Sequence, residues 1–118
     1  SPEVIDQLPL NPKGNPLEIA RVAGICAAKK TSELIPLCHP ILLNHADVEV
    51  RIESEGVRIL SSVAANGPTG VEMEALTAAA AAALTVYDMT KALDTAIDIQ
   101  DLYLLEKTGG KSGDFRRS

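Results

Sequence analysis

One alanine-rich segment begins with Val71-Glu72-Met73-Glu74-Ala75-Leu76-Thr77-Ala78 and ends with Tyr87-Asp88-Met89-Thr90-Lys91. Alanine and leucine are strong helix formers, so a helix is predicted over residues 71–93. Two carboxylates stand at its start and an Asp/Lys pair at its end. At about 1.5 Å per residue, the nineteen positions from Glu72 to Lys91 span roughly 28 Å. If both charged groups serve one small-molecule site, a second subunit must supply one of them.

A second helix is predicted upstream, over residues 16–30. Asn15 suits the N-cap position and Pro16 the first helical position. The expected buried stripe follows helical spacing and consists of Ile19, Val22, Ala23, Cys26 and Ala27. Residues 2–8 are compatible with a further short helix, and residues 31–37 with a turn.

Two antiparallel strands are predicted between the long helices. Apolar and charged residues alternate over residues 47–53, the pattern of a half-exposed strand. Glu55 and Gly56 favour a turn, and residues 57–65 are expected to form the partner strand. Residues 102–106 form a predicted last strand. This order of elements indicates an α+β fold, with an antiparallel sheet and helices on one face.

Composition limits the class of protein. The length of 118 residues suits a single domain over residues 1–118, and the net charge of −5 argues against a nucleic-acid-binding protein. The sequence contains no apolar run long enough to span a bilayer and only two cysteines, so a cytoplasmic protein with reduced thiols is expected. A core built from Ala, Leu, Ile and Val with few aromatic residues buries little area per residue, which favours oligomerisation.

The carboxylates at the start of the 71–93 helix have two interpretations. The run Thr69-Gly70-Val71-Glu72 fits a capping box, and acidic residues near a helix N-terminus interact favourably with the helix dipole. Glu72 and Glu74 would then stabilise the helix while Met73 packs in the core. In the alternative interpretation these residues face a ligand.

The Asp/Lys pair at the end of the helix is also open to two interpretations. Asp88 and Lys91 lie three residues apart and share a helix face. Such a pair is usually solvated and contributes less than about 1 kcal/mol. Apolar neighbours such as Leu84 and Leu93 predict partial burial, however, and burial would shift the pKa of Lys91 and suit it to acid–base chemistry.

Two further segments carry reactive side chains. Cys38, His39 and His45 are candidate zinc ligands, but no Cys-x-x-Cys pair accompanies them, so no metal site is predicted and a structural histidine is the alternative. The glycine-rich segment 107–113 resembles part of a phosphate loop, although Leu105 replaces its first glycine. It suits phosphate contact through glycine N–H groups and lysines, or else it is a flexible polar terminus.

Taken together, these segments resemble the cyclic pyranopterin monophosphate synthases of molybdenum-cofactor biosynthesis, the MoaC family. The matching blocks occur in family order across nearly the whole chain. They are Lys13-Gly14, Ala20-Arg21-Val22-Ala23-Gly24-Ile25, Ala27-Ala28-Lys29-Lys30-Thr31, Leu34-Ile35-Pro36-Leu37-Cys38-His39-Pro40, Thr69-Gly70-Val71-Glu72-Met73-Glu74-Ala75-Leu76-Thr77-Ala78, Tyr87-Asp88-Met89, Lys91-Ala92, Lys107, and Gly109-Gly110-Lys111-Ser112-Gly113.

The resemblance implies a ferredoxin-like subunit assembled as a hexamer of three dimers, with active sites at dimer interfaces. It implies conversion of 3′,8-cyclo-7,8-dihydro-GTP to cyclic pyranopterin monophosphate and pyrophosphate. No redox cofactor is expected, and a Mg²⁺ ion accompanying the triphosphate is compatible with this chemistry. The family positions imply catalytic roles for Lys13, Asp88 and Lys91. They imply substrate-binding roles for Cys38, His39, Glu72, Met73, Lys107 and Lys111, with Glu74 left between the site and a helix cap.

Family members usually carry a further upstream segment that includes a strand and a basic residue near the site. We therefore expect that segment to be disordered, removed or absent, with a sheet edge left for a partner to cover. The alternative function is a catalytically impaired module that retains the nucleotide or pterin pocket.

Overall fold

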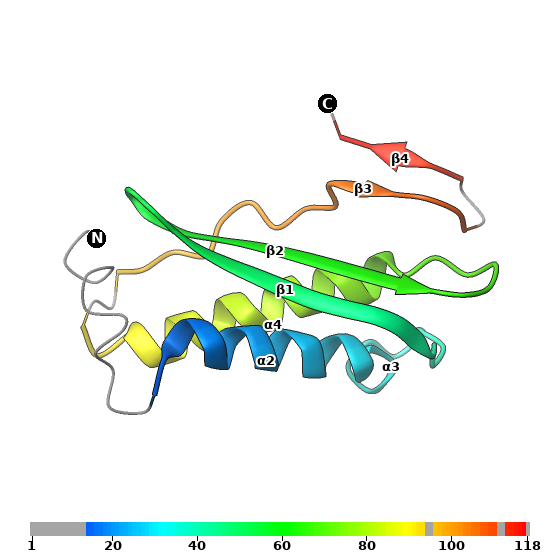
Figure 1. Ribbon diagram of the computed structural model, residues 1–118. Coiled ribbons are helices and arrows are strands. Elements are labelled where there is room, and N and C mark those ends of the chain that lie inside the picture. The colour runs from blue at the N-terminus through cyan, green and yellow to red at the C-terminus, as the bar shows by residue number, and fades with distance from the viewer. Residues whose placement is uncertain (1–13, 94–95, 111–112, 118) are drawn as a thin grey trace.

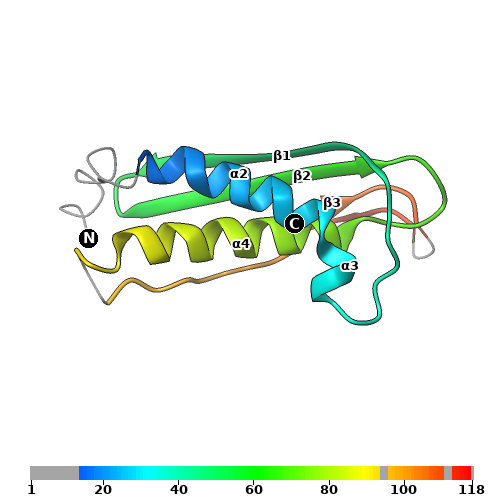
Figure 2. The same cartoon turned by 90° about the horizontal axis from the view of Figure 1, so that it is seen from below.

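The computed structural model describes residues 14–93, 96–110 and 113–117. Its elements are α2 (Pro16–Lys29), α3 (Thr31–Leu34), β1 (Leu43–Glu53), β2 (Gly56–Ala65), α4 (Glu72–Thr90), β3 (Glu106–Lys107) and β4 (Phe115–Arg116). β1 and β2 form an antiparallel hairpin, and α2 and α4 lie side by side against one face of it (Figures 1 and 2). This confirms the predicted α+β class and is compatible with a ferredoxin-like arrangement. The short helix predicted over residues 2–8 lies outside the described residues.

The contact between α2 and α4 is built from small side chains. Ala20, Gly24 and Ala28 of α2 and Ala78 and Ala82 of α4 are buried. A β-carbon added to Gly24 would lie 2.8 Å from the carbonyl oxygen of Ala78 and 2.8 Å from Cγ2 of Val48. The two helix backbones and β1 therefore meet at a point where only glycine fits.

This close contact explains why the predicted stripe of α2 is partly wrong. Ile19, Val22 and Cys26 are exposed, whereas Ala27 is buried as expected. The helix turns its smallest side chains inward because they let the backbones approach, and it leaves Ile19 and Val22 outside while Ile25 is partly buried against the core. Hydrophobicity at helical spacing selects the larger residues and so misplaces the buried face.

Of three local predictions around the helices, one is confirmed and two are wrong. The Asn15 side chain accepts a hydrogen bond from the Leu17 N–H at 3.0 Å, which confirms the N-cap. At the start of α4 the predicted capping box is wrong, because Val71 occupies the N-cap position and no side chain caps the helix. Residues 31–37 contain α3 rather than only a turn, and the Thr31 hydroxyl donates to the last carbonyl groups of α2.

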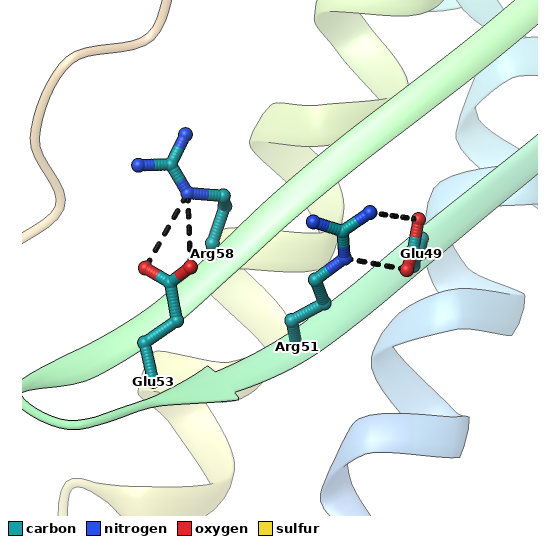
Figure 3. A network of polar contacts seen from close by, with 4 residues as sticks. All are labelled: Glu49, Arg51, Glu53 and Arg58. Atoms are coloured by element: carbon teal, nitrogen blue, oxygen red, sulfur yellow. Dashed lines mark hydrogen bonds and ion pairs between the residues drawn. The ribbon is translucent and has the colours of Figure 1, made fainter.

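The β1–β2 hairpin has the predicted pairing, with a longer first strand. β1 begins at Leu43 rather than at residue 47, and a register irregularity lies between Leu43 and His45. Ion pairs between Glu49 and Arg51 and between Glu53 and Arg58 accompany this hairpin (Figure 3). Hydrogen bonds from Arg51 lower the pKa of Glu49, so this contact stabilises the fold above the ordinary glutamate pKa of 4.5 and is lost as the pH falls through the lower folded-state value.

The predicted last strand over residues 102–106 is wrong except at its final residue. Only Glu106 and Lys107 form β3, which pairs with β4 and not with the β1–β2 hairpin. Residues that follow the glycine-rich segment, Phe115 and Arg116, supply this local partner. The Arg117 N–H donates to the Leu105 carbonyl at 2.7 Å, and the Arg117 guanidinium stacks on Tyr103. Within the described residues, no helix is both long and apolar enough to cross a membrane.

We expect the Gly24→Ala variant to lower the free energy of unfolding by about 1–3 kcal/mol, as overpacking of a tight core does. The loss should occur although alanine has the better helix propensity. Urea denaturation measures it. Gly56→Ala is the matched control because no atom lies within 4 Å of its added β-carbon, and its effect should stay within about 0.5 kcal/mol. Equal stability of the two variants would contradict the close-packing interpretation.

Candidate active site

The candidate site residues divide between the two ends of α4. The helix is nineteen residues long, about 28 Å, with Glu72 at its start and Lys91 directly after its end. The α3–β1 loop and the β3–β4 turn lie at the end of the subunit where α4 starts, and α2 begins at the opposite end (Figure 2). A single subunit therefore keeps the carboxylates and the Asp88–Lys91 pair apart, as the sequence predicts.

At the start of α4, Glu72 and Lys107 come together from distant parts of the chain. Lys107 Nζ lies 3.8 Å from Glu72 Oε1, and the lysine side chain is only 16% exposed. Glu72 Oε2 is buried and has no hydrogen-bond partner among the described residues. A buried acceptor without a partner is costly, which marks this carboxylate as a candidate site residue. A ligand N–H would reach that oxygen only after the side chain rotates.

Two glycines form the backbone around this contact. A β-carbon on Gly70 would collide with the Glu72 carboxylate, and one on Gly110 would lie 3.3 Å from the Cα and N atoms of Gly70. The β3–β4 turn therefore packs directly against the segment that leads into α4. We call Gly70, Glu72, Lys107 and Gly110 the helix-start cluster.

The neighbouring acidic residue takes a different position. Glu74 is 4% exposed, whereas the Glu72 side chain is 37% exposed. Residues two apart on a helix do not share a face, which explains the difference. Met73 is half-buried. Glu74 is thus neither a side-chain cap nor a member of the helix-start cluster in this subunit.

The loop between α3 and β1 carries the thiol and imidazole candidates. Cys38 is half-buried and its N–H donates to the Ile35 carbonyl, while His39 is exposed. His45 lies in β1, and its Nε2 is 3.0 Å from the Ser62 hydroxyl. Among residues 14–93, 96–110 and 113–117, no three His, Cys, Asp or Glu side chains gather as metal ligands. Cys38, His39 and His45 therefore do not come together as a set of zinc ligands in this subunit.

At the end of α4, Lys91 Nζ lies 2.8 Å from Asp88 Oδ1, and the two side chains are 55% and 60% exposed. The predicted partial burial is wrong for the isolated subunit because Leu84 and Leu93 are themselves exposed. The hydrogen bond to Asp88 raises the pKa of Lys91, with the opposite charge as the second cause. The ammonium form of Lys91 is thus favoured, and this form neutralises an anion.

Two predicted site residues, Lys13 and Lys111, lie outside the described residues. The structure also reveals contacts that the sequence did not indicate. The Asn44 side-chain amide donates to Asn66 at 3.0 Å and ties β1 to the loop before α4, and Asp114 accepts from the Gly109 N–H at 2.9 Å. Asp114 follows Gly113 directly, and a carboxylate beside a glycine turn is a local signal that would have indicated the second contact.

The fold and the separated charged groups define a class of protein. It is a small α+β subunit that presents carboxylates at the start of one long helix and a lysine directly after its end. The sequence model of the MoaC family matches residues 2–110, and this chain belongs to that family.

Two curated relatives are each named cyclic pyranopterin monophosphate synthase. The protein from Deinococcus radiodurans is 53% identical over 105 residues, which cover 89% of this chain and 62% of the relative. The protein from Staphylococcus carnosus is 56% identical over 110 residues, which cover 91% of this chain and 68% of the relative. The chain spans roughly two-thirds of the length of these relatives.

We expect Asp88→Asn to lower the pKa of Lys91 toward the ordinary lysine value of 10.5, because it removes the charged acceptor. The Lys91 amine should then react faster with acetic anhydride at mildly alkaline pH, as measured by peptide mass spectrometry. Lys29, an exposed lysine on another helix, is the internal reference. An unchanged ratio of Lys91 to Lys29 labelling would contradict the role of Asp88.

The same contact has a defined effect on stability. Because the folded-state pKa of Lys91 is raised, its contribution is fully present below pH 10.5 and is lost as the pH rises through the folded-state value. The stability difference between wild type and Asp88→Asn should therefore be constant at neutral pH and shrink only under strongly alkaline conditions. Equilibrium unfolding at several pH values measures this difference.

Proposed function

We propose that this chain is a cyclic pyranopterin monophosphate synthase, which converts 3′,8-cyclo-7,8-dihydro-GTP into cyclic pyranopterin monophosphate and pyrophosphate. The observation that carries the proposal is the placement of the family's motifs. The Glu72–Lys107 contact stands at one end of a single rigid helix and the Asp88–Lys91 pair at the other. The names of the two relatives support the same activity.

The chemistry requires proton transfers on the ring and sugar, together with charge neutralisation at a triphosphate. In the proposal, Lys91 acts as general acid or base and Asp88 orients it. Asp88 raises the pKa of Lys91, so its ammonium form suits charge neutralisation at the triphosphate. In the proposal, Lys13 serves in proton transfer or at the phosphates. No redox cofactor is required, and a Mg²⁺ ion with the triphosphate is compatible with these roles.

Binding of the substrate is assigned to the opposite end of α4. In the proposal, the Glu72 carboxylate turns its unsatisfied oxygen toward the substrate and accepts from the N–H donors of a guanine-type ring. Lys107 and Lys111 are assigned to phosphate contact. The remaining ring-binding residues of the proposal are Cys38, His39, Met73 and Glu74.

We further propose that the active unit is a homo-oligomer, a hexamer of three dimers with sites at dimer interfaces. The length of α4 supports this, since neither end reaches the other within a subunit. Exposed apolar side chains support it as well, because Leu37 and Leu42 are each 93% exposed in the loop that carries Cys38. A cytoplasmic location accords with the two free cysteines.

We expect the purified protein to release pyrophosphate from 3′,8-cyclo-7,8-dihydro-GTP, as measured by a coupled pyrophosphate assay. Lys91→Ala should reduce turnover to background and leave assembly intact, because Lys91 is an exposed side chain directly after the end of α4. Size-exclusion chromatography with light scattering checks assembly. Binding of the compound by wild type without pyrophosphate release would instead identify an impaired binding module.

The shared-site proposal has a complementation test. Lys91→Ala and Glu72→Gln should each be inactive alone, and their mixed dimers should contain one intact site out of two. Random exchange of equal amounts should restore about a quarter of the wild-type sites. The double variant Lys91→Ala/Glu72→Gln mixed with either single variant is the control, since none of its mixed dimers has an intact site. Absence of activity after verified subunit exchange would refute a shared site.

A further inference from the structure

The turn between β3 and β4 is unusual in its glycine content. Gly109, Gly110 and Gly113 adopt left-handed φ angles of 77°, 77° and 74°. Glycine reaches this region without steric cost, but it also loses more conformational freedom on folding than any other residue. A turn with three such positions therefore needs a specific contact to hold one conformation.

Asp114 supplies that contact. Its Oδ1 accepts a hydrogen bond from the Gly109 N–H at 2.9 Å. The backbone bond across the same turn, from the Gly113 N–H to the Gly110 carbonyl, is longer at 3.4 Å. The shorter bond is the stronger one, so the Asp114 side chain is the main constraint on the described part of the turn.

The β3–β4 turn also restricts the position of the Lys107 side chain. This lysine ends β3 opposite Phe115, the residue next to Asp114. Its Nζ lies 3.9 Å from the β-carbon position of Gly110, on a backbone that packs against Gly70. The closed turn is therefore one wall of the space in which the ammonium faces Glu72. If the turn opened, Lys107 would lose that wall and gain rotameric freedom.

We propose that Asp114 is a positioning residue, which closes the glycine turn and thereby holds Lys107 in place for the phosphate groups of the substrate. This inference rests on the proposed function of the chain. Asp114 acts through the turn and not by touching the substrate. Its effect falls on substrate binding more than on the chemical step, because it acts through Lys107, which the proposal assigns to phosphate contact, and not through the proton-transfer pair Asp88–Lys91.

Two substitutions separate the hydrogen bond from the charge. Asp114→Asn keeps an oxygen that accepts from the Gly109 N–H, whereas Asp114→Ala removes the acceptor. We expect Asp114→Ala to raise KM for 3′,8-cyclo-7,8-dihydro-GTP about tenfold with kcat within about threefold, and Asp114→Asn to keep both values within about threefold of wild type. Glu106→Ala is the matched control, because it removes the hairpin's ion pair with Arg116 and leaves the turn bond intact.

A readout independent of turnover keeps the inference separate from the proposed function. Hydrogen–deuterium exchange of the peptide over residues 105–117 should be faster in Asp114→Ala than in Asp114→Asn, and pyrophosphate should bind more weakly to Asp114→Ala in a calorimetric titration. If wild type does not turn over, the proposed function fails and these two measurements still test Asp114. Wild-type exchange and pyrophosphate affinity in Asp114→Ala would overturn the inference. An equal loss in Asp114→Asn would also overturn it.

Discussion

The close contact between α2 and α4 is the constraint on which the rest of the structure depends. Gly24 allows the α2 backbone to meet the Ala78 carbonyl and the Val48 side chain, and alanines continue the contact along both helices. Small side chains bury little area each, so the helix–helix contact relies on close packing, while Val48, Val86 and the partly buried Ile, Leu and Val side chains of the sheet complete the core. The sheet and both helices are held together at this one interface.

That packing makes α4 a rigid spacer. A helix packed along its length against α2 and the sheet cannot bend to bring Glu72 toward Lys91. The two charged groups therefore serve separate regions of the subunit surface, and a shared pocket requires a second copy. The exposed Asp88–Lys91 pair accords with this arrangement, since a group that completes a neighbour's site has to be accessible at the surface of its own subunit.

In the helix-start cluster, the β3–β4 hairpin contributes a side chain to the start of α4, which is far from it in sequence. The β3–β4 hairpin forms its own small sheet, yet its glycine turn packs against Gly70 and brings Lys107 to Glu72. Asp114 links the conformation of that turn to the environment of the lysine. Phosphate contact in the proposed reaction thus depends on backbone geometry at glycines as well as on positive charge.

The amino-acid sequence determined the elements whose signals are local. Alanine content predicted α4, Asn15-Pro16 predicted the start of α2, and alternation predicted the β1–β2 hairpin, because propensity, capping and side-chain period act over a few residues. The separation of the two charged groups also followed from sequence, since helix rise is constant. Family motifs identified the candidate residues without placing them.

Tertiary structure decided what depends on distant neighbours. It selected the alanine and glycine face of α2 over the larger apolar stripe, because the approach of α4 sets the space available. It replaced the predicted strand over residues 102–106 with the short β3–β4 hairpin, because pairing depends on where the residues after the glycine turn lie in space. It left Asp88 and Lys91 exposed, because burial of a side chain depends on what packs against that helix face and not on its neighbours in sequence. The contact between the two side chains raises the pKa of Lys91.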